Sequence, residues 1–157
     1  MTLYLGNIPS QQELIEIITH ELGHIVDLGI LKGSRYVNQR AFRSTDRRLF
    51  AIDDASLRFY DISRLDNTTR KASATAMGFV GGYAMSDPFE DFAESFNMYL
   101  NHHNVFALLS TKDSELKKKF LFMEKLFNKK YLQADTATTA QIKDSLDMRP
   151  RDTTRGY

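Results

Sequence analysis

Apolar residues recur at helical spacing from about residue 10 to residue 28. The stretch opens with SQQE at residues 10–13, which fits a capping box with Ser10 as the N-cap and Glu13 as the third helical residue. Apolar positions three or four residues apart predict an amphipathic helix that ends near Leu28, before Gly29. The expected buried side of this helix consists of Leu14, Ile17, Ile18, Leu22, Ile25 and Leu28.

Two further helices are predicted in the second half of the chain. Asp87 and Pro88 form an N-cap and first-turn pair, and the aromatic stripe that follows indicates a helix to about Leu100. Another helix begins near Asp113 and runs to about Phe127. Weaker patterns predict a strand at residues 3–8, a short helix within residues 53–65 and one more helix within residues 136–148.

Together these elements predict a mainly α fold of the α+β type, with a small or single-strand β edge at the N-terminus. The chain has 157 residues, of which 42% are hydrophobic, enough for one domain with a core. We expect this domain to span residues 1–132, and residues 133–157 to form a C-terminal extension.

Composition excludes several kinds of function. The net charge of +1 gives no strong field for nucleic acid, and no membrane-spanning run is found. Residues 110–157 carry 11 Lys and Arg against 7 Asp and Glu, which we interpret as a solvated basic face. The absence of cysteine excludes disulfides, thiolate zinc sites and a cysteine nucleophile. The N-terminus does not read as a signal peptide, so we expect a secreted or cell-surface protein if an upstream region is missing, and a cytoplasmic one otherwise.

The candidate chemistry lies in HELGH, residues 20–24, inside the first predicted helix. His20 and His24 are four residues apart, so both rings leave the same helix face and can bind one metal ion. Glu21 is rotated by about 100° from His20, which places its carboxylate beside the metal as a base for an ionisable water. Two satisfied core histidines are the alternative interpretation, but this combination on an apolar helix favours zinc.

A catalytic zinc needs three protein ligands and an open position. The extended His-Glu-x-x-His motif would need Gly and His where this chain has Asp27 and Ile30, so it does not supply the third ligand. His102 and His103 are interpreted as surface residues near the end of the second helix. The remaining candidates are Glu90 and Glu94, on one face of that helix, and the spacing alone leaves the choice between them open.

HELGHIVD, followed by YAMSDPFEDFAESF, resembles the anthrax lethal factor-like zinc peptidases, a branch of the gluzincins that includes the clostridial Pro-Pro endopeptidases. The resemblance covers roughly residues 12–29 and 80–100 and implies a zincin-like catalytic domain. The roles that it implies are as follows: His20, His24 and Glu90 bind one zinc ion per chain, Glu21 is the general base, Tyr83 donates to the oxyanion, Glu94 orients a ligand histidine, and Asp27 either supports that arrangement or satisfies nearby polar groups.

Only 19 residues precede His20, whereas members of this family carry a multi-stranded sheet there. The chain is therefore expected to be a fragment that lacks this sheet. The span from His24 to Glu90 is also long for this family, so an insertion or lid is expected at residues 30–80. The sequence predicts a zinc-dependent endopeptidase that acts on a protein or peptide, and it leaves the oligomeric state open. One alternative is a catalytically idle zinc-binding interaction domain of a larger toxin or surface protein. Another is a structural zinc site, for which no fourth ligand is evident.

Overall fold

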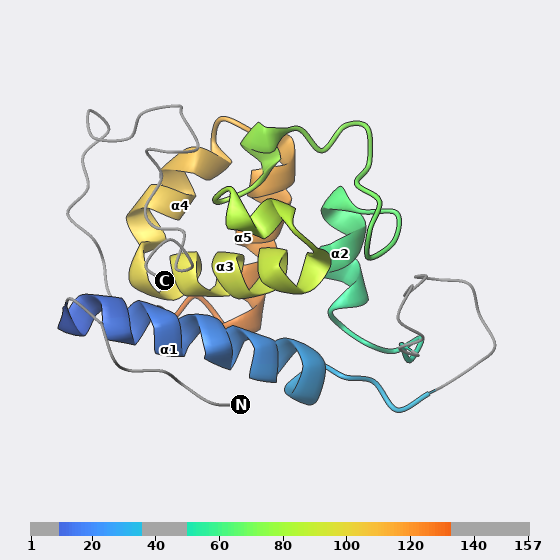
Figure 1. The fold of residues 1–157 in the computed structure, drawn as a ribbon, viewed down its shortest axis with the longest axis horizontal. Helices are drawn as coiled ribbons and strands as arrows, with labels where there is room; N and C mark the ends of the chain where they lie inside the picture. The colour runs from blue at the N-terminus through green and yellow to red at the C-terminus, as the bar shows by residue number, and fades with distance from the viewer. Residues whose placement is uncertain (1–9, 36–49, 133–157) are drawn as a thin grey trace.

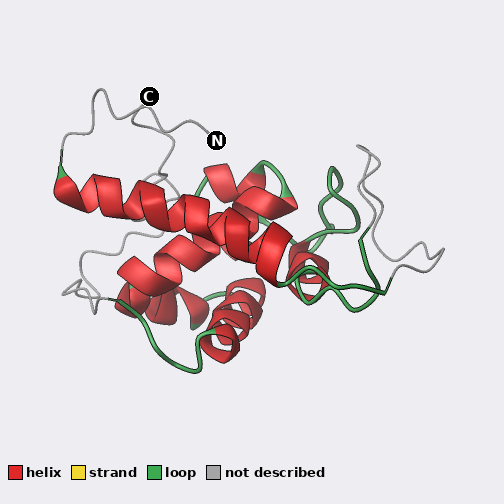
Figure 2. Ribbon diagram, turned by 90° about the horizontal axis from the view of Figure 1, so that it is seen from below, coloured by secondary structure: helices red, strands yellow, loops and turns green. Residues whose placement is uncertain are grey.

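The computed structural model describes residues 10–35 and 50–132, and this part of the chain is mainly helical (Figures 1 and 2). Its α-helices are α1 (Gln11–Ile25), α2 (Leu57–Ser63), α3 (Pro88–Asn101), α4 (His103–Ser110) and α5 (Ser114–Leu126). A π-helical turn, η1 (Val26–Ile30), continues α1, and two 3-10 turns, η2 (Ala76–Gly78) and η3 (Tyr83–Met85), precede α3. Within the described residues there is no strand, only an isolated antiparallel bridge between Arg64 and Arg70. The mainly α prediction is therefore confirmed.

The predicted caps begin the three long helices. Ser10 Oγ accepts a hydrogen bond from the Glu13 amide at 3.1 Å, so Ser10 is the N-cap of α1. Asp87 Oδ1 accepts from the amides of Phe89 and Glu90 at 2.8 and 2.9 Å, and Pro88 occupies the first turn of α3. Asp113 caps α5 in the same way. Side-chain oxygens thus satisfy amide groups that a helix start leaves without partners.

Helix α3 lies at the centre of the molecule. Figure 1 shows α1 running alongside it, with α5 behind and α4 and α2 at its two ends. Nearly all of α3 is buried, and its aromatic residues belong to the hydrophobic core. Among the members of this core are Phe59, Phe79, Phe92, Phe96, Tyr99, Phe106 and Phe120. Because α3 is packed on several sides, the position of each side chain on it is strongly constrained.

The predicted buried side of α1 is wrong. Ile17 is buried and Leu14 half-buried, but Ile18, Leu22, Ile25 and Leu28 are between 38 and 51% exposed. The face of α1 that packs on α3 is instead the small and polar one, with Glu13, Glu16, Thr19, His20, Gly23 and Asp27 buried along α1 and its π turn. A Cβ added at Gly23 would lie 2.9 Å from the Ala93 Cα, so the glycine lets the two helices approach closely. Close approach, rather than apolar content, selects the packed face.

His102 and His103 are half-buried, so the surface prediction for them is wrong. His102 Nε2 lies 3.2 Å from Glu16 Oε1, and the His103 ring stacks on Tyr131 at a centroid distance of 3.8 Å. Helix α4, which starts at His103, was not predicted. The strand at residues 3–8, the helix within 136–148 and the C-terminal extension lie outside the described residues. In the described segments, no helix is both long and apolar enough to cross a membrane.

Candidate metal centre

Three side chains from two helices converge where α1 meets the first turn of α3. One ligand atom from each of His20, His24 and Glu90 lies within 4.8 Å of the others. Oε2 of Glu90 is 3.1 Å from His20 Nε2 and 3.4 Å from His24 Nε2. The two imidazole rings are 4.9 Å apart and nearly perpendicular. Two imidazole nitrogens and a carboxylate oxygen are donors that zinc prefers in a three-ligand protein site.

Local sequence explains why these atoms meet. The four-residue spacing of His20 and His24 directs both rings toward α3. The Asp87 cap fixes the start of α3, so Glu90 occupies its third helical position and faces α1. The close contact between Gly23 and Ala93 brings α1 and α3 near each other, so that the histidines of α1 can reach the carboxylate of α3.

Glu94, one turn after Glu90, contacts the other side of the His20 ring. Its Oε1 lies 2.7 Å from His20 Nδ1, and its side chain is 3% exposed. A neutral His20 that donates its Nδ1 proton to Glu94 leaves the Nε2 lone pair free on the Glu90 side. The structure thus separates the two glutamates that the spacing alone could not distinguish: Glu90 approaches both histidines, and Glu94 approaches only the far nitrogen of one.

The electrostatics of the cluster favour a cation. Burial by itself lowers the pKa of His20, but its contacts with Glu90 and Glu94 raise it to about 9. Burial by itself raises the pKa of Glu90, and the two histidines lower it to about 2. Oε2 of Glu90 is buried, and neither histidine contact has the alignment of a hydrogen bond. A buried carboxylate oxygen that lies beside two imidazole nitrogens is the arrangement expected of metal ligands.

Tyr83 lies close to this cluster and Glu21 follows His20 in the chain, but neither is among the three converging residues. Tyr83 is half-buried in η3, and its ring centroid is 6.2 Å from that of His20. Burial and the neighbouring Glu90 carboxylate raise the pKa of Tyr83, so its hydroxyl remains a proton donor in hydrogen bonds at neutral pH. Glu21 is half-buried on α1, directly after His20.

Asp27 is bound to α2. Its carboxylate accepts a hydrogen bond from Tyr60 Oη, which lies 2.6 Å from both oxygens, and its main-chain carbonyl accepts one from Ser56 Oγ at 3.2 Å. Burial raises the pKa of Asp27 to about 7, although these hydroxyl groups oppose the shift. Asp27 therefore fastens the end of the α1 segment to α2, and its hydrogen bonds satisfy polar groups of that contact.

Sequence reasoning missed a second group of charged residues, on the other side of α3. Lys119 was included in the solvated basic face, but its side chain is fully buried, with Nζ 2.8 Å from Asp91 Oδ2. Arg64, also buried, donates to the main-chain carbonyl of Met85. Of the three successive lysines at 117–119, only the third is buried. It lies three residues after the buried Leu116, and this shared helix face was the one available signal.

Comparison with known proteins assigns a family. The family model described as "Putative zinc-binding metallo-peptidase" matches residues 4–135, which is most of the chain. No curated protein and no solved structure matches the chain. Together with the cluster of His20, His24 and Glu90, which could hold a metal ion, this match shows zinc as the cofactor. The chain belongs to this family of zinc-binding metallopeptidases.

Proposed function

We propose that the protein is a zinc-dependent endopeptidase of the gluzincin type, with His20, His24 and Glu90 as zinc ligands. The observation that carries the proposal is the convergence of these three donors from two helices within 4.8 Å. The spacing of Tyr83, Glu90 and Glu94 after the HELGH motif supports the finer placement among the lethal factor-like peptidases. The expected substrate is a protein or peptide, since the family is one of peptidases.

Zinc bound to these residues supplies a Lewis acid, which lowers the pKa of a coordinated water to near neutrality. Glu21 acts as the general base, because it follows His20 and its side chain leaves α1 about 100° away from the ligand face. A base in this position receives the proton of the attacking water without competing for the metal. It then returns that proton to the leaving amine.

Tyr83 and Glu94 have supporting roles in this proposal. The Tyr83 hydroxyl stays protonated and donates a hydrogen bond to the oxyanion of the tetrahedral intermediate. Glu94 Oε1 accepts a hydrogen bond from His20 Nδ1, 2.7 Å away, which holds the ring with Nε2 toward Glu90. Because charge develops on the oxyanion only as the reaction proceeds, Tyr83 should affect turnover more than substrate affinity.

The experiment compares zinc-loaded wild type, Glu21→Gln and Tyr83→Phe on a library of peptides, with products identified by mass spectrometry. Glu21→Gln should keep one zinc and its fold but lose peptide hydrolysis by at least about 100-fold. Tyr83→Phe should lower kcat more than it changes KM. Undiminished peptide hydrolysis by Glu21→Gln would show that Glu21 is not the general base. A zinc-loaded, folded wild type that cleaves no peptide would instead support the idle interaction domain.

A further inference from the structure

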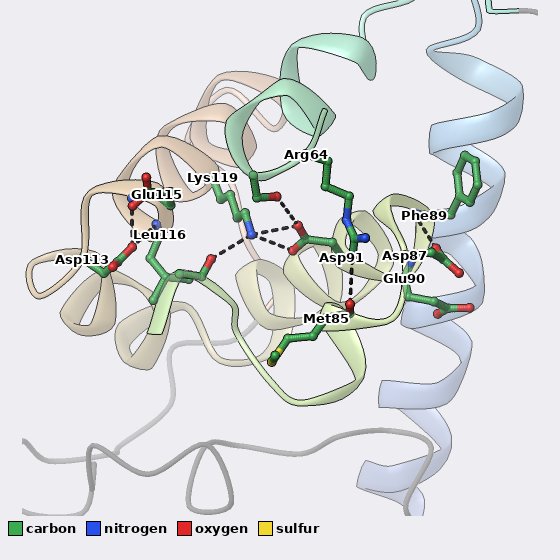
Figure 3. A network of polar contacts seen from close by, with 12 residues as sticks. Arg64, Met85, Asp87, Phe89, Glu90, Asp91, Asp113, Glu115, Leu116 and Lys119 are labelled. Carbon is green, nitrogen blue, oxygen red and sulfur yellow. Dashed lines mark hydrogen bonds and ion pairs between the residues drawn. The ribbon is translucent and has the colours of Figure 1, made fainter. Parts of the chain in front are cut away.

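The segment that carries Tyr83 is held at both ends by buried cations. Lys119 Nζ donates to the main-chain carbonyl of Gly78 at 2.8 Å, and Arg64 Nη2 donates to that of Met85 at 2.9 Å. Figure 3 shows both side chains reaching this part of the chain from other elements. Gly78 ends η2 and Met85 ends η3, so the two contacts enclose the stretch that contains Tyr83.

The Asp91 carboxylate pairs directly with Lys119. Burial lowers the pKa of Arg64, and the charge of Asp91 opposes that shift without a direct contact. Both oxygens of Asp91 lie within 2.9 Å of Lys119 Nζ, and Ser63 Oγ donates to Asp91 Oδ2 at 3.0 Å. The Phe79 ring, at the start of the segment, packs against the Lys119 ammonium at 3.9 Å. Lys119 is 0% exposed, and Asp91 and Arg64 are each 1% exposed. The network therefore joins α2, α3, α5 and the Tyr83 segment without contact with solvent.

Asp91 follows Glu90 directly, so the same turn of α3 carries both networks. Figure 3 shows Glu90 directed toward α1 and Asp91 directed toward Lys119, on opposite sides of α3. The Tyr83 segment also passes beside the metal cluster, since a Cβ added at Gly81 would lie 3.9 Å from Glu94 Oε2. A shift of this segment would therefore move Tyr83 relative to the donors on α1 and α3.

Burial of an ion pair contributes little net free energy to the stability of a fold. Desolvation of each charge costs several kcal/mol, and well-packed apolar residues of similar volume often stabilise as well or better. A directed ammonium or guanidinium differs from an apolar side chain in that it fixes the position of the carbonyl to which it donates. Here the two carbonyls belong to the segment that carries Tyr83.

We propose that Lys119, with Asp91 as its counter-ion, and Arg64 are positioning residues that fix the Gly78–Met85 segment and thereby place Tyr83 beside the zinc-binding side chains. The catalytic consequence rests on the function proposed above. The structural consequence does not, because the position and dynamics of the segment can be measured without any substrate.

Hydrogen exchange tests the structural part. The variant Lys119→Met with Asp91→Asn removes both charges, so that neither is left buried alone. Its amides at Met85 and Ser86, which donate to Gly82 and Tyr83, should exchange at least about tenfold faster than in wild type, whereas those of α1 should be unchanged. Lys118→Met, at the exposed neighbouring lysine, is the matched control and should match wild type. Unchanged exchange at Met85 and Ser86 in the double variant would overturn the proposal, whether or not the protein hydrolyses peptides.

A double-mutant cycle tests the catalytic part. In zinc-loaded protein the Lys119→Met, Asp91→Asn variant should lower kcat by about 10- to 100-fold, with KM and zinc affinity little changed. In a Tyr83→Phe background the same pair should lower kcat less than about twofold, because its effect passes through Tyr83. An equal loss in both backgrounds would indicate a general structural role and overturn the assignment.

Arg64→Lys serves as a second variant, and it alone decides the matter if the double variant does not fold. It keeps the positive charge but withdraws the guanidinium from the Met85 carbonyl. It should reproduce the faster exchange of the Met85 amide, and its loss in kcat should likewise disappear in the Tyr83→Phe background. Exchange at Met85 and kcat equal to those of wild type in Arg64→Lys would overturn the role of Arg64, and would overturn the whole proposal if the double variant does not fold. If the variants exchange faster as expected but the wild-type protein cleaves no peptide, the proposed function is wrong and the positioning of the Tyr83 segment still holds.

Discussion

Glu90 and Asp91 are neighbours on one turn of α3, yet they have opposite electrostatic surroundings. Asp91 meets a protein cation, Lys119, at 2.8 Å and is 1% exposed. Glu90 meets two imidazoles, His20 and His24, at 3.1 and 3.4 Å, and 18% of its side chain is exposed. Burial raises the pKa of Asp91 and lowers that of Lys119, and each charge opposes the shift of the other.

The difference distinguishes a structural charge pair from a metal centre. The Asp91 carboxylate is paired with a cation that is part of the fold, so it needs no metal ion to offset its charge. The Glu90 carboxylate faces groups that are neutral when they act as metal ligands, and a zinc ion balances it there. Substitutions on the two sides should therefore change different quantities: metal affinity on the Glu90 side and folding on the Asp91 side.

The largest expected effect is on the Glu90 side. Glu90→Ala removes one of three ligands and should abolish tight zinc binding, while the metal-free protein keeps its helical circular dichroism. Lys118→Met should bind zinc as wild type does. Zinc titration against a competing chelator measures the affinities. Tight zinc binding by Glu90→Ala would show that another residue is the third ligand.

The next effect is on the Asp91 side. Lys119→Met leaves a buried carboxylate without its partner and should lower the free energy of unfolding by about 3–5 kcal/mol. Lys118→Met, on the exposed face of α5, should change it by less than about 0.5 kcal/mol. Urea unfolding of the metal-free proteins measures both values. Equal stability of the two variants would show that the buried pair makes no net contribution.

A smaller effect is expected for Glu94, which touches only the far nitrogen of His20. Glu94→Ala should weaken zinc binding by about 10- to 100-fold, because it frees the ring without removing a ligand. Glu94→Gln, whose amide oxygen can still accept the Nδ1 proton, should lose less. If Glu94→Ala lost zinc outright while Glu90→Ala retained it, the two roles would be reversed.

The last effect is a pH dependence of stability and concerns Asp27, a buried acid that accepts hydrogen bonds from neutral hydroxyls. Its pKa is about 7 in the folded protein and 3.8 ordinarily, so the native state binds its proton more tightly than the unfolded chain. Its contribution to stability is therefore complete below pH 4 and is lost as the pH rises toward 7, by about 1.4 kcal/mol per pH unit.

Asp27→Asn should remove this slope, since an amide stays neutral and can still accept from Tyr60. The window between pH 4.5 and 6.5 isolates this effect. His20 loses its contribution to stability only as the pH rises from 6.5 to about 9. Glu90 loses its contribution only as the pH falls from 4.5 to about 2. Urea unfolding of wild type and variant with a chelator present measures the difference. Parallel pH profiles for the two proteins would show that Asp27 is ionised in the folded state.

The sequence predicted the helices that carry the candidate site better than it predicted their packing. Ser10, Asp87 and Asp113 mark helix starts through local hydrogen bonds, which need no tertiary information. The buried side of α1 was wrong, because an apolar stripe was assumed to face the core and Gly23 was not recognised as the point of close approach. The roles assigned to Glu21, Tyr83 and the zinc ligands remain predictions.

Lys119 illustrates what the sequence could not provide. It stands in a run of three lysines, and its partner Asp91 lies 28 residues earlier, so no local pattern identifies that pairing. The choice between Glu90 and Glu94 is similar, because spacing places both on one face of α3. Only the path of α1 across that face brings Glu90 to two histidines and Glu94 to one.

The most direct test of the zinc centre is the metal content of the folded protein. Purified wild type is dialysed against a weak chelator, and zinc is then quantified by elemental analysis alongside circular dichroism. The account predicts about one equivalent of zinc per chain for wild type and less than one tenth of that for Glu90→Ala. A fully folded wild type that retains no zinc would contradict the account.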